Sequence, residues 1–161
     1  MLPRQLRENL LTMFGDMDKE QRVELAKSLF KEGYNCAQAV TAAYADLYGF
    51  SREQALRMSA SFGGGIGKMR ETCGAACGMF ILAGLKTGTV DPSDREGKAA
   101  NYAFVRELAE KFRQENGALK CGDLLGLSKQ TAPEGSVLMR KPKRPCYMMV
   151  ESAARIWSDY L

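Results

Sequence analysis

Paired capping residues recur along this 161-residue chain, and they constrain its fold more than any other feature. In a capping box, the residue before a helix accepts a hydrogen bond from the third helical N–H, and the third side chain bonds back. Four pairs have this spacing or a close relative of it: Asp18 with Gln21, Asn35 with Gln38, Ser51 with Gln54, and Ser93 with Glu96. Glycines that could close helices in a left-handed conformation follow at Gly33, Gly49, Gly88 and Gly117. These local signals divide the chain into helices.

Apolar residues between the signals repeat with helical spacing, as at Ala37, Val40, Tyr44 and Leu47. No stretch shows a sustained alternation of β-branched residues. We expect helices over 2–14, 19–32, 36–48, 52–61, 73–87, 94–116, 121–127 and 146–160. The predicted fold is therefore all-α, a single-domain compact bundle of about six to eight helices. Residues 1–18 would form a helical extension and 19–161 a core that contains the cysteines.

The chain has no histidine, which excludes several classes of site. A Ser-His-Asp triad, a Cys-His dyad and a histidine-ligated haem or zinc cannot form within it. The net charge of +4 is mild, and we expect no nucleic-acid binding. We interpret the one basic cluster, 140–144, as a solvated loop. We also expect no signal peptide and no membrane insertion, hence a cytoplasmic protein, in which cysteines are more often reactive or metal-ligating than disulfide-bonded.

Most of the five cysteines fall at predicted helix starts. They are Cys36 after the cap Asn35, Cys73 after Thr72, Cys146 after Pro145, and Cys121 at the opening of the short segment 121–127. Unpaired N–H groups and the helix dipole favour an anion there, so we expect lowered thiol pKa values. We predict that Cys73 is the attacking thiol and that Cys36 or Cys146 resolves the product. For any single cysteine, simple core filling is the alternative.

A glycine-rich segment, 62–68, leads into the helix of Cys73. It lacks the spacing of a Walker A loop. Its glycines would instead allow close backbone approach and could direct N–H groups toward a thiolate or a cluster sulfur. We therefore assign a ligand-binding role to Gly63, Gly64, Gly65 and Gly67. Cys77 lies one helical turn after Cys73, and we expect it to fill the core.

Taken in order, these landmarks resemble the C_GCAxxG_C_C family, small bacterial and archaeal proteins to which a redox role is assigned from their cysteines. The landmarks are Cys36, the Gly-Gly-Gly-Ile-Gly loop, the segment Cys73-Gly74-Ala75-Ala76-Cys77-Gly78, Cys121 and Cys146. The resemblance covers roughly 20–160 and implies that Cys36, Cys73, Cys121 and Cys146 are the four family cysteines. The family motif spells Gly-Cys-Ala where this chain has Cys73-Gly74-Ala75, so the motif itself matches approximately, and Cys77 falls on a variable position.

Two classes of function follow. In the first, Cys36, Cys73, Cys121 and Cys146 meet in one pocket of a redox protein, where they either cycle through disulfides or hold an iron–sulfur cluster or zinc. Its partner would be an unknown redox protein. The alternative is a non-catalytic module that carries a metal or a small ligand to a partner enzyme or transporter, with cysteines that are inert or purely ligating. The apolar N-terminal segment could dock in cis or pair two copies into a homo-oligomer.

Overall fold

The computed structural model describes residues 3–6, 16–126 and 145–161. Its α-helices are α2 (Lys19–Lys31), α3 (Cys36–Ala42), α4 (Arg52–Ser59), α5 (Gly74–Thr87), α6 (Arg95–Asn116), α7 (Cys121–Leu124) and α8 (Pro145–Ser158). Two 3₁₀ helices, η1 (Ala45–Tyr48) and η2 (Ala60–Phe62), follow α3 and α4. These ranges contain no β-strand and only an isolated antiparallel bridge between Thr72 and Lys120. The prediction of an all-α fold is confirmed.

Three of the four predicted capping boxes are present, before α2, α3 and α4. At α3, which carries Cys36, the Gln38 amide donates to Asn35 Oδ1 at 2.9 Å, and the Asn35 amide donates to Gln38 Oε1 at 3.1 Å. The fourth box is wrong. Asp94 caps α6 by accepting from the Gly97 amide, while Ser93 donates to the side chain of Asp91. A carboxylate one residue later therefore replaces the serine as the cap.

Three of the four predicted helix-closing glycines adopt the left-handed conformation: Gly33, Gly49 and Gly117 have φ of 109°, 85° and 87°. Gly88 does not, because its φ of −66° and ψ of 136° are those of extended backbone. Helix α5 therefore ends at Thr87 and continues as extended backbone into the connection to α6. The prediction for Gly88 is wrong.

The expected helix 36–48 is interrupted, because α3 ends at Ala42 and η1 begins at Ala45. The Ala43 carbonyl accepts a hydrogen bond from Arg22 Nη1 at 2.9 Å. Next to it, the buried Tyr44 hydroxyl donates to the Ala154 carbonyl at 2.8 Å. These tertiary contacts divert the backbone from the helical pattern that its apolar spacing predicts.

Two sequence predictions fall partly or wholly outside the described residues. Residues 4–6 are helical, but the rest of the predicted helix 2–14 lies outside apart from residue 3. The basic cluster 140–144 and residue 127, the predicted end of the short helix 121–127, also lie outside.

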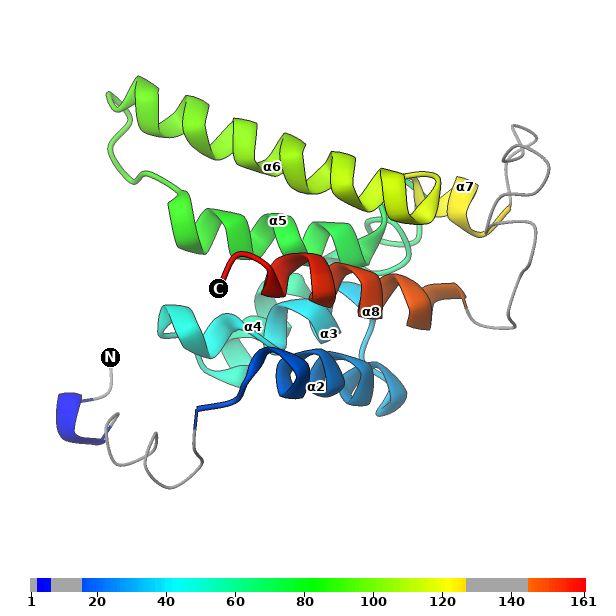
Figure 1. Ribbon diagram of the computed structural model, residues 1–161, viewed down its shortest axis with the longest axis horizontal. Coiled ribbons are helices and arrows are strands. Elements are labelled where there is room, and N and C mark those ends of the chain that lie inside the picture. The colour runs from blue at the N-terminus through cyan, green and yellow to red at the C-terminus, as the bar shows by residue number, and fades with distance from the viewer. Residues whose placement is uncertain (1–2, 7–15, 127–144) are drawn as a thin grey trace.

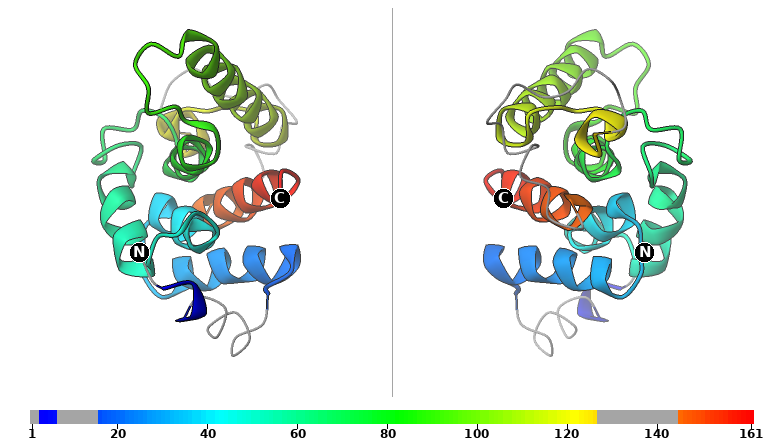
Figure 2. Two further views of the ribbon diagram at one scale, coloured as in Figure 1. Left: turned by 90° about the vertical axis from the view of Figure 1, so that its left-hand side faces the viewer. Right: turned by 90° about the vertical axis from the view of Figure 1, so that its right-hand side faces the viewer.

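Helices α3 and α5 form the middle of the molecule (Figures 1 and 2). Helix α5 contacts α3, α6 and α8, while α3 also contacts α2, α4 and α8. The last helix, α8, lies against α2, α3, α5 and α6. The C-terminal segment therefore packs against helices from the beginning and from the middle of the chain. This arrangement brings the starts of α3, α5, α7 and α8 to one end (Figure 1).

Small residues allow α3 and α5 to approach closely. A Cβ added at Gly78 would lie 2.8 Å from Val40 Cβ, and one added at Gly74 would overlap the sulfur of Cys36. Atoms this close repel one another, so these two positions on one face of α5 accept only glycine without displacement of α3. The contact therefore fixes Cys36 against the beginning of α5.

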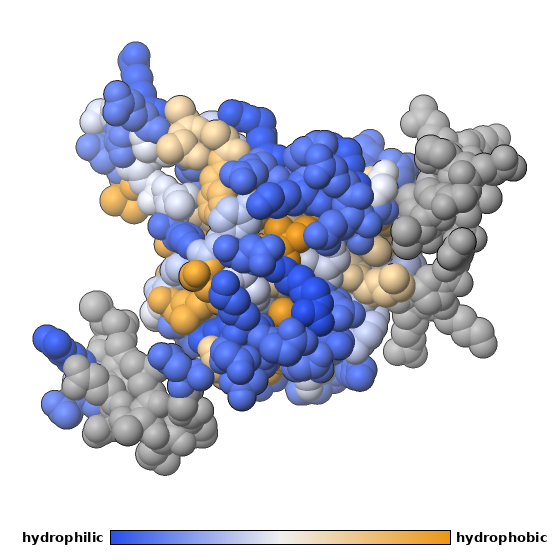
Figure 3. All heavy atoms as spheres, viewed as in Figure 1, coloured by the Kyte–Doolittle hydropathy of each residue, from blue (hydrophilic) through white to orange (hydrophobic). Residues whose placement is uncertain are grey.

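Hydrophilic residues cover most of the face shown in Figure 3, and apolar residues form small separate groups on it. No helix among the described residues is both long enough and apolar enough to cross a bilayer. The large apolar side chains are mostly inside, with Trp157, Tyr44, Phe112 and Leu29 among the largest fully buried ones.

Two glycines on α5 provide a matched test of the α3–α5 contact. We expect Gly78→Ala to lower the free energy of unfolding by about 1–3 kcal/mol, because its methyl group overlaps Val40. Gly84→Ala meets nothing within 4 Å, and we expect it to raise stability by about 0.5–1 kcal/mol through helix propensity. Urea denaturation measures both, and equal effects of the two substitutions would contradict the close contact.

Candidate functional site

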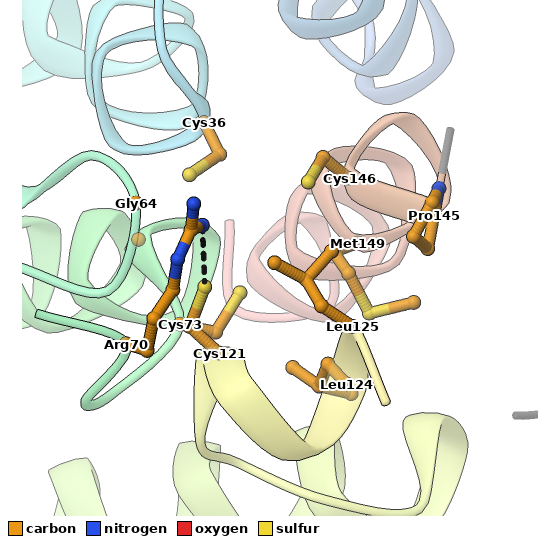
Figure 4. Close-up of a pocket in the computed structure, with 11 residues that line it drawn as sticks. Cys36, Gly64, Arg70, Cys73, Cys121, Leu124, Leu125, Pro145, Cys146 and Met149 are labelled. Carbon is orange, nitrogen blue, oxygen red and sulfur yellow. Dashed lines mark hydrogen bonds between the residues drawn. The ribbon is translucent and has the colours of Figure 1, made fainter. Parts of the chain in front are cut away.

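Four cysteines line one open hollow at the end of the bundle. The sulfurs of Cys36 and Cys146 face this space from α3 and α8, and Cys73 and Cys121 line it from the start of α5 and from α7 (Figure 4). The remaining lining residues are Gly64, Arg70, Gly74, Leu124, Leu125, Pro145 and Met149. The structure thus brings together the four cysteines that the sequence singles out.

Each of the four cysteines lies at the beginning of a different helix. Cys36 and Cys121 are the first residues of α3 and α7, and Cys146 is the second residue of α8. Cys73 differs by one position from its prediction, because it is the N-cap of α5 and not a first-turn residue. The extended backbone of Cys73, with ψ of 131°, results from its pairing with the segment before α7.

The chain segments around Thr72 and Lys120 pair in a short antiparallel contact, which holds Cys73 and Cys121 on one face of the pair. The Cys73 amide donates to the Leu119 carbonyl at 2.8 Å, and the Cys121 amide donates to the Glu71 carbonyl at 2.6 Å. Thr72 and Lys120 face each other between these hydrogen bonds. Because side chains alternate along paired segments, Cys73 and Cys121 point to the same face, diagonally across the bridge.

The glycine-rich loop is wound in the left-handed conformation. Gly64, Gly65 and Gly67 have φ of 67°, 71° and 57°, and three residues with side chains share this conformation: Ile66, Lys68 and Arg70, at 65°, 62° and 61°. The left-handed conformation costs a non-glycine residue about 1–2 kcal/mol. Hydrogen bonds from the Arg70 amide to the Gly64 carbonyl and from the Glu71 amide to the Gly65 carbonyl close the loop on itself.

The four predicted loop glycines have different roles. Gly64 lines the hollow, and a Cβ at Gly65 would lie 2.5 Å from Cys121 Cβ. A Cβ at Gly63 would instead meet the side chain of Asn35, the cap of α3, and one at Gly67 would meet nothing within 4 Å. Among the four, only Gly65 has a cysteine side chain where its Cβ would lie. A Cβ at Gly64 would meet Lys68, while the Gly64 amide bonds to the thiol of Cys36.

Burial raises the pKa of the Cys36, Cys73 and Cys146 thiols above the ordinary value. The shift is largest at Cys73, which is only 5% exposed. Neighbouring thiols add to the rise, since Cys121 raises the pKa of the other three. The prediction of lowered pKa values is wrong for these three thiols, because desolvation outweighs the backbone N–H groups at the helix starts.

Arg70 is a site residue that the sequence does not single out. Its Nη1 donates to Cys121 Sγ at 3.6 Å, and its charge lowers the pKa of Cys146. Arg70 is three residues from Cys73 in the chain but reaches the hollow only because the left-handed loop turns it inward. A single basic residue that follows a glycine-rich segment does not predict that its side chain points into a cysteine site.

Cys77 is buried but does not line the hollow. Its thiol lies 3.8 Å from the Thr72 carbonyl oxygen, and burial followed by the nearby Cys36 raises its pKa to about 11. Its interior position agrees with the expectation that it fills space, and it makes Cys77 a natural control for the other four.

All five cysteines are free thiols. In the described ranges, no three or more histidine, cysteine, aspartate or glutamate side chains are gathered closely enough to hold a metal ion.

Timed alkylation of the reduced, metal-free protein tests the effect of burial. We expect iodoacetamide to modify the partly buried Cys146 before Cys73. A raised pKa leaves less thiolate at neutral pH, so both rates should increase as the pH rises beyond about 8.5, the ordinary pKa of cysteine. Peptide mass spectrometry at pH 7 and pH 9 measures the order, and fastest modification of Cys73 at pH 7 would contradict it.

A protein-family model described as "Putative redox-active protein (C_GCAxxG_C_C)" matches residues 34–160. No curated protein matches the chain, and no solved structure does. The matched range contains all five cysteines and the whole glycine loop. The chain therefore belongs to the C_GCAxxG_C_C family.

Proposed function

We propose that this protein is an electron-transfer protein in which Cys36, Cys73, Cys121 and Cys146 hold an iron–sulfur cluster. The observation that carries the proposal is the convergence of four thiols, from four separate helix starts, on one hollow. Four cysteine thiolates are the usual ligands of two- and four-iron clusters. With no histidine in the chain, sulfur is the only soft ligand available there.

The spacing of the thiols favours a cluster over a zinc ion. Structural zinc requires four ligands in a tight tetrahedron, with sulfurs about 2.3 Å from the metal. In the described part of the chain, no group of side chains is compact enough to hold a single ion. A cluster of several iron atoms accepts ligands that lie farther apart than those of one zinc ion, and on this ground we propose a cluster.

The placement of Cys73 and Cys121 disfavours a disulfide between these two cysteines. Cys73 and Cys121 occupy diagonal positions across a bridge, and such residues lie about 7–8 Å apart. Disulfides usually join Cα atoms about 4.4–6.8 Å apart, so this pair would need backbone movement. The raised pKa of the buried Cys73 thiol also makes it a slow nucleophile at neutral pH.

Donors around the sulfurs would compensate the negative charge of such a centre. The Gly64 amide favours the thiolate of Cys36, and the Ala75 and Ala76 amides favour that of Cys73. The Arg70 guanidinium adds a full positive charge at Cys121. Buried thiolates need such partners, because an uncompensated charge in an apolar site is costly.

When bound, the cluster would supply one-electron transfer. The chain's own residues would hold it and control its surroundings. Leu124 and Met149 are buried beside the cysteines and limit the access of water. Cys146 and Arg70 lie at the more exposed side of the hollow, where an electron-transfer partner would approach.

Alanine substitutions separate the four proposed ligands from the fifth cysteine. After anaerobic reconstitution with iron and sulfide, we expect Cys36→Ala, Cys73→Ala, Cys121→Ala and Cys146→Ala to lose most of the bound iron, because each removes one ligand. Cys77→Ala should retain it, since this thiol lies outside the hollow. Iron and sulfide analysis with visible absorption measures the cluster, and circular dichroism confirms the helical fold of each variant.

Equal iron loss in Cys77→Ala and the four ligand variants would contradict the assignment. A wild-type protein that binds no iron but loses two hydrogens per cysteine pair on mild oxidation would instead support disulfide cycling. A protein that does neither would favour the accessory-module alternative.

A further inference from the structure

We propose that Arg70 is a positioning residue that raises the reduction potential of the four-cysteine centre. This inference rests on the proposed function and extends it to a residue outside the family's cysteine pattern. Arg70 is the one charged side chain that lines the hollow among the described residues.

The guanidinium of Arg70 points into the hollow, toward the sulfur of Cys121 (Figure 4). Its Nη1 is 3.6 Å from Cys121 Sγ, within the range of a hydrogen bond to sulfur. The Arg70 cation is therefore in direct contact with one of the four proposed ligands.

Backbone contacts hold Arg70 at this place. Its φ of 61° is in the left-handed region, which a long side chain rarely occupies. The Arg70 amide donates to the Gly64 carbonyl and the Gly122 amide donates to the Arg70 carbonyl, each at 3.2 Å. The second of these bonds ties Arg70 to the residue after Cys121. Strain of this kind persists where the surrounding structure requires it, and it concentrates at functional positions.

No carboxylate among the lining residues neutralises Arg70. The adjacent Glu71 forms an ion pair with Lys120 at 3.6 Å, and both side chains are more than half exposed. The cation is therefore directed at sulfur and not at an acidic side chain of the hollow.

The sign of the effect follows from charge. A centre with four thiolate ligands is already anionic, and reduction adds one electron to it without forming or breaking a bond. A nearby positive charge stabilises the reduced, more negative form more strongly than the oxidised form. Removal of that charge should therefore make reduction less favourable.

The test compares Arg70→Met, Arg70→Lys and Lys68→Met in the reconstituted protein, titrated anaerobically with dithionite as the electron donor. We expect Arg70→Met to lower the one-electron reduction equilibrium constant about tenfold, which corresponds to about 59 mV. Arg70→Lys should restore most of the potential because it keeps the charge. Lys68→Met is the matched control, since Lys68 is an exposed basic residue of the same left-handed loop that does not line the hollow.

Iron content is measured for every variant, so that a change in potential is separated from loss of the cluster. An unchanged potential in Arg70→Met, or an equal shift in Lys68→Met, would overturn the assignment to Arg70. If the wild-type protein binds no iron, the proposed function fails and this inference fails with it, whereas bound iron with an unchanged potential in Arg70→Met overturns the inference alone.

Discussion

The contact between α3 and α5 is the constraint on which the cysteine site depends. Gly74 leaves space for the Cys36 sulfur, and Gly78 leaves space for Val40 one turn later. Because both glycines lie on one face of α5, the two helices approach closely along their length. The beginning of α3 is thereby fixed beside the beginning of α5, and Cys36 beside Cys73. The bridge between Thr72 and Lys120 then places Cys121, and α8 brings Cys146 from the far end of the chain.

Two electrostatic effects compete at this site, and burial is the stronger of them in the free-thiol form. Helix starts and loop amides favour thiolates, yet desolvation raises the pKa of Cys36, Cys73 and Cys146. This balance favours the protonated form of these three thiols until a cation replaces the protons. When a metal binds, the thiols release their protons, and the metal cation compensates the negative charge of the thiolates. The same burial that weakens the thiols as nucleophiles is thus compatible with their role as ligands.

The sequence was sufficient to predict what depends on local interactions. Capping side chains act within one turn, so the starts of α2, α3 and α4 were predicted correctly from residues such as Asn35 and Gln38. The convergence of four cysteines was also expected, from the family resemblance and from their shared position at helix starts. Predictions failed where distant residues determine the backbone, as at Ala43, whose carbonyl bonds Arg22.

Arg70 could not be identified from the sequence for the same reason. Its position depends on a left-handed loop closed by hydrogen bonds to Gly64 and Gly122, and no local pattern specifies that conformation for an arginine. The thiol pKa values were mispredicted because helix position is visible in the sequence whereas burial is not. Cys73 illustrates this, since its helix start was correct to within one residue but its exposure is only 5%.

The most direct test of the central claim is the intact mass of the anaerobically purified protein under non-denaturing conditions. The account predicts a mass above that of the polypeptide by the iron and sulfide of one cluster. The mass of the polypeptide alone, in protein kept free of oxygen throughout, would contradict it.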